Sequence, residues 1–236
     1  MARRQHAAEG LKVPPSFRFE RAVLKRLPQA IVAGVDEAGR GPLAGPVVAA
    51  AVILDLKKTP KELRQGLDDS KKLPRERREE LYALLLGCGT AVIGVGQADV
   101  HEIDSLNILN ATYKAMSRAV DALGRMVTLA LVDGNRAPPM TCEVQTIIEG
   151  DGKTLSIAAA SIVAKVTRDR IMHDLALAHP GYGWETNVGY GTRAHYEGMA
   201  RMGVTPHHRR SFAPVRAALA GVDATQIEMF DPQAAE

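Results

Sequence analysis

The sequence predicts an α/β fold built on a mixed β-sheet with helices packed against it. Short apolar runs rich in β-branched residues, typical of buried strands, alternate with longer segments in which apolar residues recur at helical spacing. The first two runs are separated only by a short segment rich in glycine and proline, which predicts a hairpin-like antiparallel pair. We therefore expect a sheet that is not wholly parallel.

The elements are expected in the following order. Polar residues 1–29 carry one short helix, near residues 20–26. Strands are expected at residues 31–35, 46–54, 91–95, 126–132 and 144–148. Helices are expected at residues 74–87, 107–123, 154–177 and 192–202. The first of these begins at Pro74, which suits a first helical turn, and the residues before it, 55–72, form an expected charged loop.

A chain of 236 residues suits one large domain with small additions. We divide it into a basic N-terminal arm at residues 1–29 and a core at residues 30–190. A C-terminal helical region at residues 191–220 and an acidic tail at residues 221–236 complete the chain.

Composition excludes several classes of protein. Hydrophobic residues make up 46% and charged residues 24%, which excludes a mainly disordered or collagen-like chain. The longest apolar run, residues 47–54, is too short to cross a bilayer, so we expect no membrane partner. Cys88 and Cys142 are too few for a disulfide framework and lack zinc-ligand spacing. Since no signal peptide is recognisable either, we expect a cytoplasmic protein. We also expect a monomer.

The net charge of +3 is small, but the charges are sorted along the chain. The stretch before the tail carries an excess of arginine, opposed by Glu197 alone, and we expect it to form a basic surface facing a polyanion. These arginines are Arg193, Arg201, Arg209, Arg210 and Arg216.

Carboxylates follow the ends of several predicted strands. Asp36 and Glu37 end the first strand, Asp133 ends the fourth, and Asp151 follows the fifth. Carboxylates at the ends of buried strands are costly unless positive charge meets them, so their convergence indicates a hard divalent cation, Mg²⁺ or Mn²⁺. Paired cations of this kind activate water and stabilise the leaving oxygen in phosphoryl transfer.

Each acid also has a plainer interpretation. Asp36 and Glu37 could end a strand at the surface, and Asp133 begins a good turn sequence with Gly134. Asp151 precedes a helix that it could cap. Taken singly the two kinds of interpretation stay open, but the coincidence of all the acids favours a site.

The segment Gly39-Arg40-Gly41 follows the first acid pair directly. Its glycines let the backbone approach a ligand closely, and the Arg40 guanidinium could bind phosphate with two hydrogen bonds. A plain turn explains the same residues. The segment has neither the lysine of a phosphate-binding loop nor the spacing of a dinucleotide fingerprint, which argues against a nucleotide cofactor.

At several ordered blocks the sequence closely resembles the ribonuclease HII family, the type 2 ribonucleases H, over roughly residues 30–216. The blocks are DEAGRGPLAG at 36–45, DSKKL at 69–73, NILNAT at 107–112, VDGN at 132–135, AASIVAKVTRD at 159–169, GYGT at 189–192 and HHRRSF at 207–212. The resemblance implies a ribonuclease H-like mixed sheet flanked by helices, with a C-terminal helical addition.

The resemblance also implies an endoribonuclease that cleaves the RNA strand of RNA–DNA hybrids. Such an enzyme nicks duplex DNA on the 5′ side of a single embedded ribonucleotide, leaving 3′-hydroxyl and 5′-phosphate ends. By motif position, Asp36, Glu37, Asp133 and Asp151 are the expected catalytic and metal-binding acids, for Mn²⁺ or Mg²⁺. They would serve an in-line attack by water on the scissile phosphate.

Substrate contacts are implied in the same way. Gly39, Arg40 and Gly41 would contact the ribose 2′-hydroxyl, and Tyr190 would pack on the following deoxyribose, where an extra hydroxyl would clash. A surface tyrosine in a glycine-rich loop is the plain alternative for Tyr190.

Three lysines, Lys71, Lys72 and Lys165, could grip phosphates, with solvated side chains as the alternative for each. Asp169 competes for the role of fourth acid, but it lies four residues after Lys165, so a helix-surface ion pair explains it. His207 and His208 have no assigned role.

The tail carries a candidate clamp-binding peptide. Gln226, Ile227, Met229 and Phe230 resemble the Gln-Leu-x-Leu-Phe peptides that bind the bacterial sliding clamp. An amphipathic tail without a partner is favoured on the sequence alone, because five-residue motifs often arise by chance.

Two other functions remain for the whole chain. Another nuclease of the same fold superfamily, such as a junction resolvase, would keep the acids but lack the GRG–tyrosine pairing. A non-catalytic module that binds hybrids would be expected to have lost an acid.

Overall fold

The computed structural model describes residues 14–223 and residue 226. The strands are β1 (Val32–Ala38), β2 (Val47–Leu54), β3 (Ala91–Ala98), β4 (Leu129–Asp133) and β5 (Glu143–Ile147). The helices of the first half are α1 (Arg18–Arg26), α2 (Lys61–Gly66), α3 (Arg75–Gly87), α4 (Val100–Leu106) and α5 (Ile108–Asp121). The later helices are α6 (Leu155–Ala178), α7 (Trp184–Asn187), α8 (Arg193–Met202) and α9 (Ala213–Leu219).

The five strands form one mixed sheet in the order β3-β2-β1-β4-β5. β1, β2 and β3 pair antiparallel, whereas β4 and β5 continue the sheet parallel to β1. The mixed sheet predicted from the short β1–β2 connection is confirmed. β1 lies at the centre, and this position explains why it reads as an almost unbroken apolar run before its acids.

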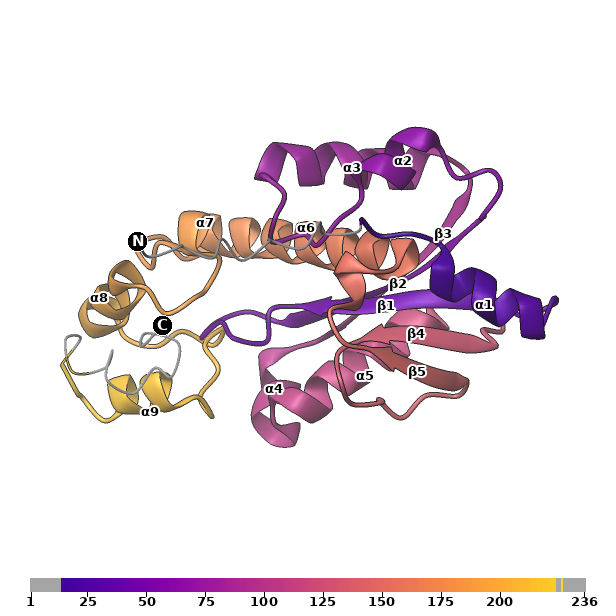
Figure 1. Cartoon of the computed structure of the whole chain (residues 1–236). Coiled ribbons are helices and arrows are strands. Elements are labelled where there is room, and N and C mark those ends of the chain that lie inside the picture. The colour runs from indigo at the N-terminus through magenta and orange to yellow at the C-terminus, as the bar shows by residue number, and fades with distance from the viewer. Residues whose placement is uncertain (1–13, 224–225, 227–236) are drawn as a thin grey trace, which may run out of the picture.

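Helices cover both faces of the sheet (Figure 1). α6 crosses β1 and β2 on one face with α3 packed beside it, and α5 covers β3, β2 and β1 on the other. α6 can lie close because Gly34 faces it: a Cβ there would be 2.1 Å from the backbone carbonyl carbon of Ser156. The small residues predicted to let α6 approach the sheet, Ala158 and its neighbours, are buried in that contact.

Helix α1 lies within the predicted N-terminal arm, yet it packs on the core. Phe17 and Val23 are buried, and Glu20 Oε1 accepts hydrogen bonds from the backbone N–H and the hydroxyl of Ser156, at the start of α6. Ser16 also forms a β-bridge with Thr154. This part of the predicted arm therefore belongs to the packed fold and supports the segment that leads into α6.

The C-terminal helices α7, α8 and α9 form a smaller lobe at one end of the sheet, where the sequence predicts a helical addition (Figure 1). Its core includes Trp184, Tyr196, Met199 and Val215, joined to the last turns of α6 through Met172. Across the described ranges, no helix is long and apolar enough to cross a membrane.

The structure corrects the sequence-based description in three places. The expected charged loop at residues 55–72 contains helix α2. Helix α4, which was not expected, begins with a capping box between Asp99 and Glu102. Arg209, counted in the basic surface, is fully buried and offers no charge to solvent.

Candidate active site

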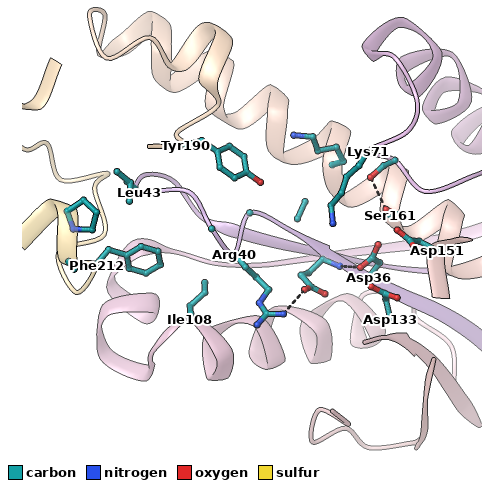
Figure 2. Close-up of a pocket in the computed structure, with 18 residues that line it drawn as sticks. Asp36, Arg40, Leu43, Lys71, Ile108, Asp133, Asp151, Ser161, Tyr190 and Phe212 are labelled. Atoms are coloured by element: carbon teal, nitrogen blue, oxygen red, sulfur yellow. Dashed lines mark hydrogen bonds and ion pairs between the residues drawn. The ribbon is translucent and has the colours of Figure 1, made fainter. Parts of the chain in front are cut away.

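The four predicted acids line one cavity of about 710 Å³ (Figure 2). Asp36 and Asp133 are neighbours because β1 and β4 are parallel and paired up to Val35 and Val132, so both strands deliver their acids to the same edge. Glu37 follows Asp36 on β1. Asp151 lies in the short 3₁₀ turn Gly150–Gly152, between β5 and α6.

Backbone N–H groups fix three of these carboxylates. Asp36 Oδ1 accepts from the Glu37 N–H at 2.7 Å, and Asp133 Oδ1 accepts from the Gly150 N–H at 2.6 Å. Asp151 Oδ1 accepts from the Gly152 N–H at 2.8 Å. Asp151 does not cap α6 through its side chain, because the Thr154 hydroxyl accepts the hydrogen bond from the first turn of that helix.

Burial and the charges of neighbouring acids raise the pKa values of three of these carboxyls. Burial raises the pKa of Asp36 well above its usual range, and the charges of Glu37 and Asp133 raise it further. Burial also raises the pKa of Asp151 to about 6, with added repulsion from Asp133 and Asp69. The pKa of Glu37 is raised by burial, although Arg40 opposes the rise. The cluster therefore holds more negative charge than its surroundings compensate.

The chemistry of this donor set fits a hard divalent cation. Carboxylate oxygens are the ligands that Mg²⁺ and Mn²⁺ prefer, and a cation would relieve the mutual repulsion. Within residues 14–223, however, no three histidine, cysteine or acidic side chains stand in a ready-made coordination arrangement. An ionised carboxylate has two oxygens with about four lone-pair sites, so a single backbone N–H bond to Oδ1 still leaves sites for a cation. The fit therefore rests on this donor chemistry.

The GRG segment and Tyr190 lie in the same cavity as the acids. Gly39 has φ of +94°, a conformation that favours glycine, and the Arg40 guanidinium contacts Glu37 Oε1 at 3.3 Å. Tyr190 lies between α7 and α8, and Figure 2 shows its ring pointing into the cavity. Two segments far apart in the sequence thus meet beside the acid cluster.

The structure separates the three candidate lysines. Lys71 and Lys165 line the main cavity, whereas Lys72 lines a neighbouring cavity of about 570 Å³ that also reaches Asp151. The predicted ion pair between Lys165 and Asp169 is confirmed at 2.8 Å. Asp169 does not line the main cavity, so it is not part of the acid cluster.

Sequence reasoning missed two serines and one acid at the site. The hydroxyls of Ser70 and Ser161 lie 2.9 Å apart, and Ser161 donates a hydrogen bond to Asp36. The Asp69 side chain hydrogen-bonds to that of Asp151. All three residues lie in sequence blocks that carry the family resemblance. That position was the one signal that could have marked them as site residues, because a serine has no diagnostic pattern of its own.

The structure describes one residue of the predicted clamp-binding peptide, Gln226. Ile227, Met229 and Phe230 lie outside the described residues. Gln226 is exposed.

Comparison with known proteins gives consistent matches. A family model described as Ribonuclease HII matches residues 33–215. A ribonuclease HII of Paramagnetospirillum magneticum is 62% identical over 185 residues, which cover 78% of this chain and 91% of that protein.

Two solved archaeal structures share the fold. The ribonuclease H2 of Pyrococcus horikoshii is 28% identical with a TM-score of 0.66, covering 84% of this chain and 98% of that one. A ribonuclease HII of Archaeoglobus fulgidus, solved in complex with PCNA, is 26% identical with a TM-score of 0.63, covering 76% of this chain and 93% of that one.

Proposed function

The chain belongs to the ribonuclease HII family and is an endoribonuclease that acts on RNA–DNA hybrids, and we propose that it also nicks duplex DNA 5′ of a single embedded ribonucleotide. The cut would leave 3′-hydroxyl and 5′-phosphate ends. One observation carries the proposal: the acid cluster, the GRG segment and Tyr190 share a single cavity. Another nuclease of the superfamily would need no GRG–tyrosine pair beside its acids.

Asp36, Glu37, Asp133 and Asp151 are proposed to hold divalent metal, Mg²⁺ or Mn²⁺. Metal bound there supplies activation of water and charge stabilisation at the leaving 3′ oxygen. The protein's contribution is to gather the carboxylates at one sheet edge and to orient them. The Ser161 hydroxyl and the Glu37 N–H direct Asp36, and the Gly150 N–H directs Asp133.

Recognition of the ribonucleotide is proposed to come from the opposite part of the cavity. Backbone groups of Gly39, Arg40 and Gly41 would contact the 2′-hydroxyl, the group that distinguishes RNA from DNA. Tyr190 would pack on the next sugar and disfavour a second hydroxyl there.

Three lysines are proposed to bind phosphates. Lys71 and Lys165 would do so inside the main cavity, and Lys72 would hold the strand where it passes the neighbouring cavity. Because such contacts release counterions, substrate affinity should fall as salt rises.

A decisive assay is metal-dependent nicking of a DNA duplex that contains one ribonucleotide, beside an identical all-DNA duplex. We expect one cut on the 5′ side of the ribonucleotide, no cut in the control, and loss of cutting with a chelator. Extension of the product by a DNA polymerase tests for the 3′-hydroxyl. Cleavage of the all-DNA duplex, or a product that cannot be extended, would contradict the proposal. Parallel reactions with Mg²⁺ and Mn²⁺ give the metal preference.

We also propose that Gln226, Ile227, Met229 and Phe230 bind the sliding clamp. The support is their resemblance to clamp-binding peptides and the PCNA complex of the Archaeoglobus relative. A pull-down with the clamp should retain the full-length protein and lose a variant that ends at Asp223. Equal retention of both would reject this role.

A further inference from the structure

Two arginines, Arg168 on α6 and Arg209 before α9, are buried in the middle of the protein, with 1% and 0% of their surface exposed. Neither takes part in any ion pair found among the described residues. Burial lowers the pKa of both, and the charge of Arg168 lowers that of Arg209 further. Two buried like charges are costly unless hydrogen bonds replace the lost hydration. What these hydrogen bonds hold in place is therefore the question that the pair raises.

All four side-chain hydrogen bonds of Arg209 go to backbone carbonyls of one loop. Its nitrogens donate to Gly39 at 2.5 Å, Arg40 at 2.9 Å, Gly45 at 3.0 Å and Pro46 at 3.2 Å. The planar fork of the guanidinium spans both ends of this loop, residues 39–46. A lysine, with one nitrogen at the end of a flexible stem, cannot do the same.

Arg168 ties the same loop to the segment that carries Tyr190. It donates to the carbonyls of Ala44 and Pro46, each at 3.1 Å, and to that of Val188 at 2.9 Å. A backbone bond from the Leu43 N–H to the Gly189 carbonyl, 2.8 Å long, reinforces the connection. Buried cationic side chains thus connect the two segments proposed to recognise the ribonucleotide, the GRG segment and the segment that carries Tyr190.

The first glycine of the GRG segment is fitted to this arrangement. A Cβ on Gly39 would lie 1.9 Å from Arg168 Nε, so no side chain fits at that position while Arg168 keeps its place. The glycine is therefore required by contact with Arg168, independently of any contact with substrate.

We propose that Arg168 and Arg209, here called the arginine brace, are positioning residues that hold the loop at residues 39–46 and the Tyr190 segment in one fixed relation. This inference rests on the proposed function. A glycine-rich loop would otherwise have to be ordered by the substrate, and the brace provides that order before binding. The brace acts through the loop and does not touch the reacting atoms.

The first test measures hydrogen exchange in the free protein. The variants are Arg209→Lys and Arg168→Lys, with the control Arg118→Lys, an exposed arginine that also donates to a backbone carbonyl, that of Gln97. We expect faster exchange confined to residues 39–46 and, for Arg168→Lys, also 188–190. Unchanged exchange in these segments, or faster exchange throughout the molecule, would overturn the brace. If Arg209→Lys does not fold, Arg209→Gln carries the same comparison.

The second test compares two substrates. A merely destabilised protein loses activity equally on a uniform RNA–DNA hybrid and on a duplex with one ribonucleotide. If the GRG segment and Tyr190 are displaced relative to each other, the enzyme should lose more activity on the single ribonucleotide. On that substrate the site must recognise one 2′-hydroxyl and the deoxyribose that follows it. We expect the ratio of the two kcat values to shift on the order of tenfold in both brace variants and to stay unchanged in Arg118→Lys, because a misplacement of about 1 Å can cost up to about a hundredfold in rate. Parallel losses on both substrates would refute the role in positioning.

The wild-type protein separates the two hypotheses. If it cuts the hybrid but not the single ribonucleotide, the proposed function fails. In that case the hydrogen-exchange result alone decides whether the brace orders the loop.

Discussion

Acid should destabilise the wild-type fold more than that of His208→Gln, by about 2 kcal/mol between pH 7 and pH 5. His208 is buried, and its Nδ1 accepts the Thr205 backbone N–H at 3.0 Å. A backbone N–H can only donate, so this nitrogen carries no proton and Nε2 carries it instead. His208 Nε2 therefore donates to His195 Nε2, 3.1 Å away.

The hydrogen-bond chain continues to the candidate site. His195 Nε2 also accepts from Trp184 Nε1 at 3.0 Å, and His195 Nδ1 donates to the Tyr190 carbonyl at 2.9 Å. Every nitrogen of the two neutral rings is used, so adding a proton to either ring breaks the chain. Burial lowers the pKa of His208 to about 3, aided by the nearby histidines, and burial lowers that of His195 to about 4.

The sign and size of the effect follow from these values. An unfolded histidine has a pKa near 6.5, and the folded His208 stays neutral down to about 3. Below pH 6.5 the His208 imidazole binds a proton in the unfolded state but stays neutral in the folded state. The free energy of unfolding therefore falls as the pH falls. Each unit costs about 1.4 kcal/mol, and the 1.5 units between 6.5 and 5 give about 2 kcal/mol.

Urea denaturation of wild type and His208→Gln at pH 7 and pH 5 measures the effect. The difference in unfolding free energy between the two proteins should shrink by about 2 kcal/mol at the lower pH, because glutamine does not titrate. His101→Gln, at an exposed position of α4, is the control and should show no such change. An equal difference at both pH values would refute the neutral, tautomer-specific chain.

Three further predictions concern the site and the fold. Asp36→Asn should lose cleavage of a duplex with one ribonucleotide yet still bind it, measured by nicking and by fluorescence anisotropy; near wild-type turnover would remove Asp36 from the catalytic acids. Tyr190→Ala should lose more kcat than affinity on that substrate, and unchanged rates would exclude it from the site. Gly34→Ala should cost about 1–3 kcal/mol in urea denaturation, since its Cβ would overlap the α6 backbone. Gly87→Ala, with nothing within 4 Å of its Cβ, is the matched control, and an equal effect of both changes would contradict the close packing.

The acids illustrate what the sequence can predict. Asp36 and Asp133 each end a short apolar run, and this local pattern was enough to place both at one edge of the sheet. The mixed sheet was likewise predictable, because the short connection between β1 and β2 leaves little choice of topology. These features depend on residues close together in the chain, where spacing and side-chain type carry the information.

The parts that were missed depend on distant contacts. Arg209 resembled its neighbours in a basic stretch, and only the folded chain shows that it bonds to carbonyls more than 160 residues away. Ser161 gains its role from Asp36 on another element. Glu20 looked like an arm residue because its partner Ser156 lies 136 positions later.

That last separation has a consequence for how the protein is made. Translation at about 5–20 residues per second leaves roughly 7–27 s between synthesis of Glu20 and synthesis of Ser156. During that interval Glu20 lacks its hydrogen-bond partner, and Leu155 and Ile157, which share the apolar clusters of Phe17 and Val23, have not yet been made. The docking of α1 is thus completed only late in biogenesis, although this helix is made long before α6.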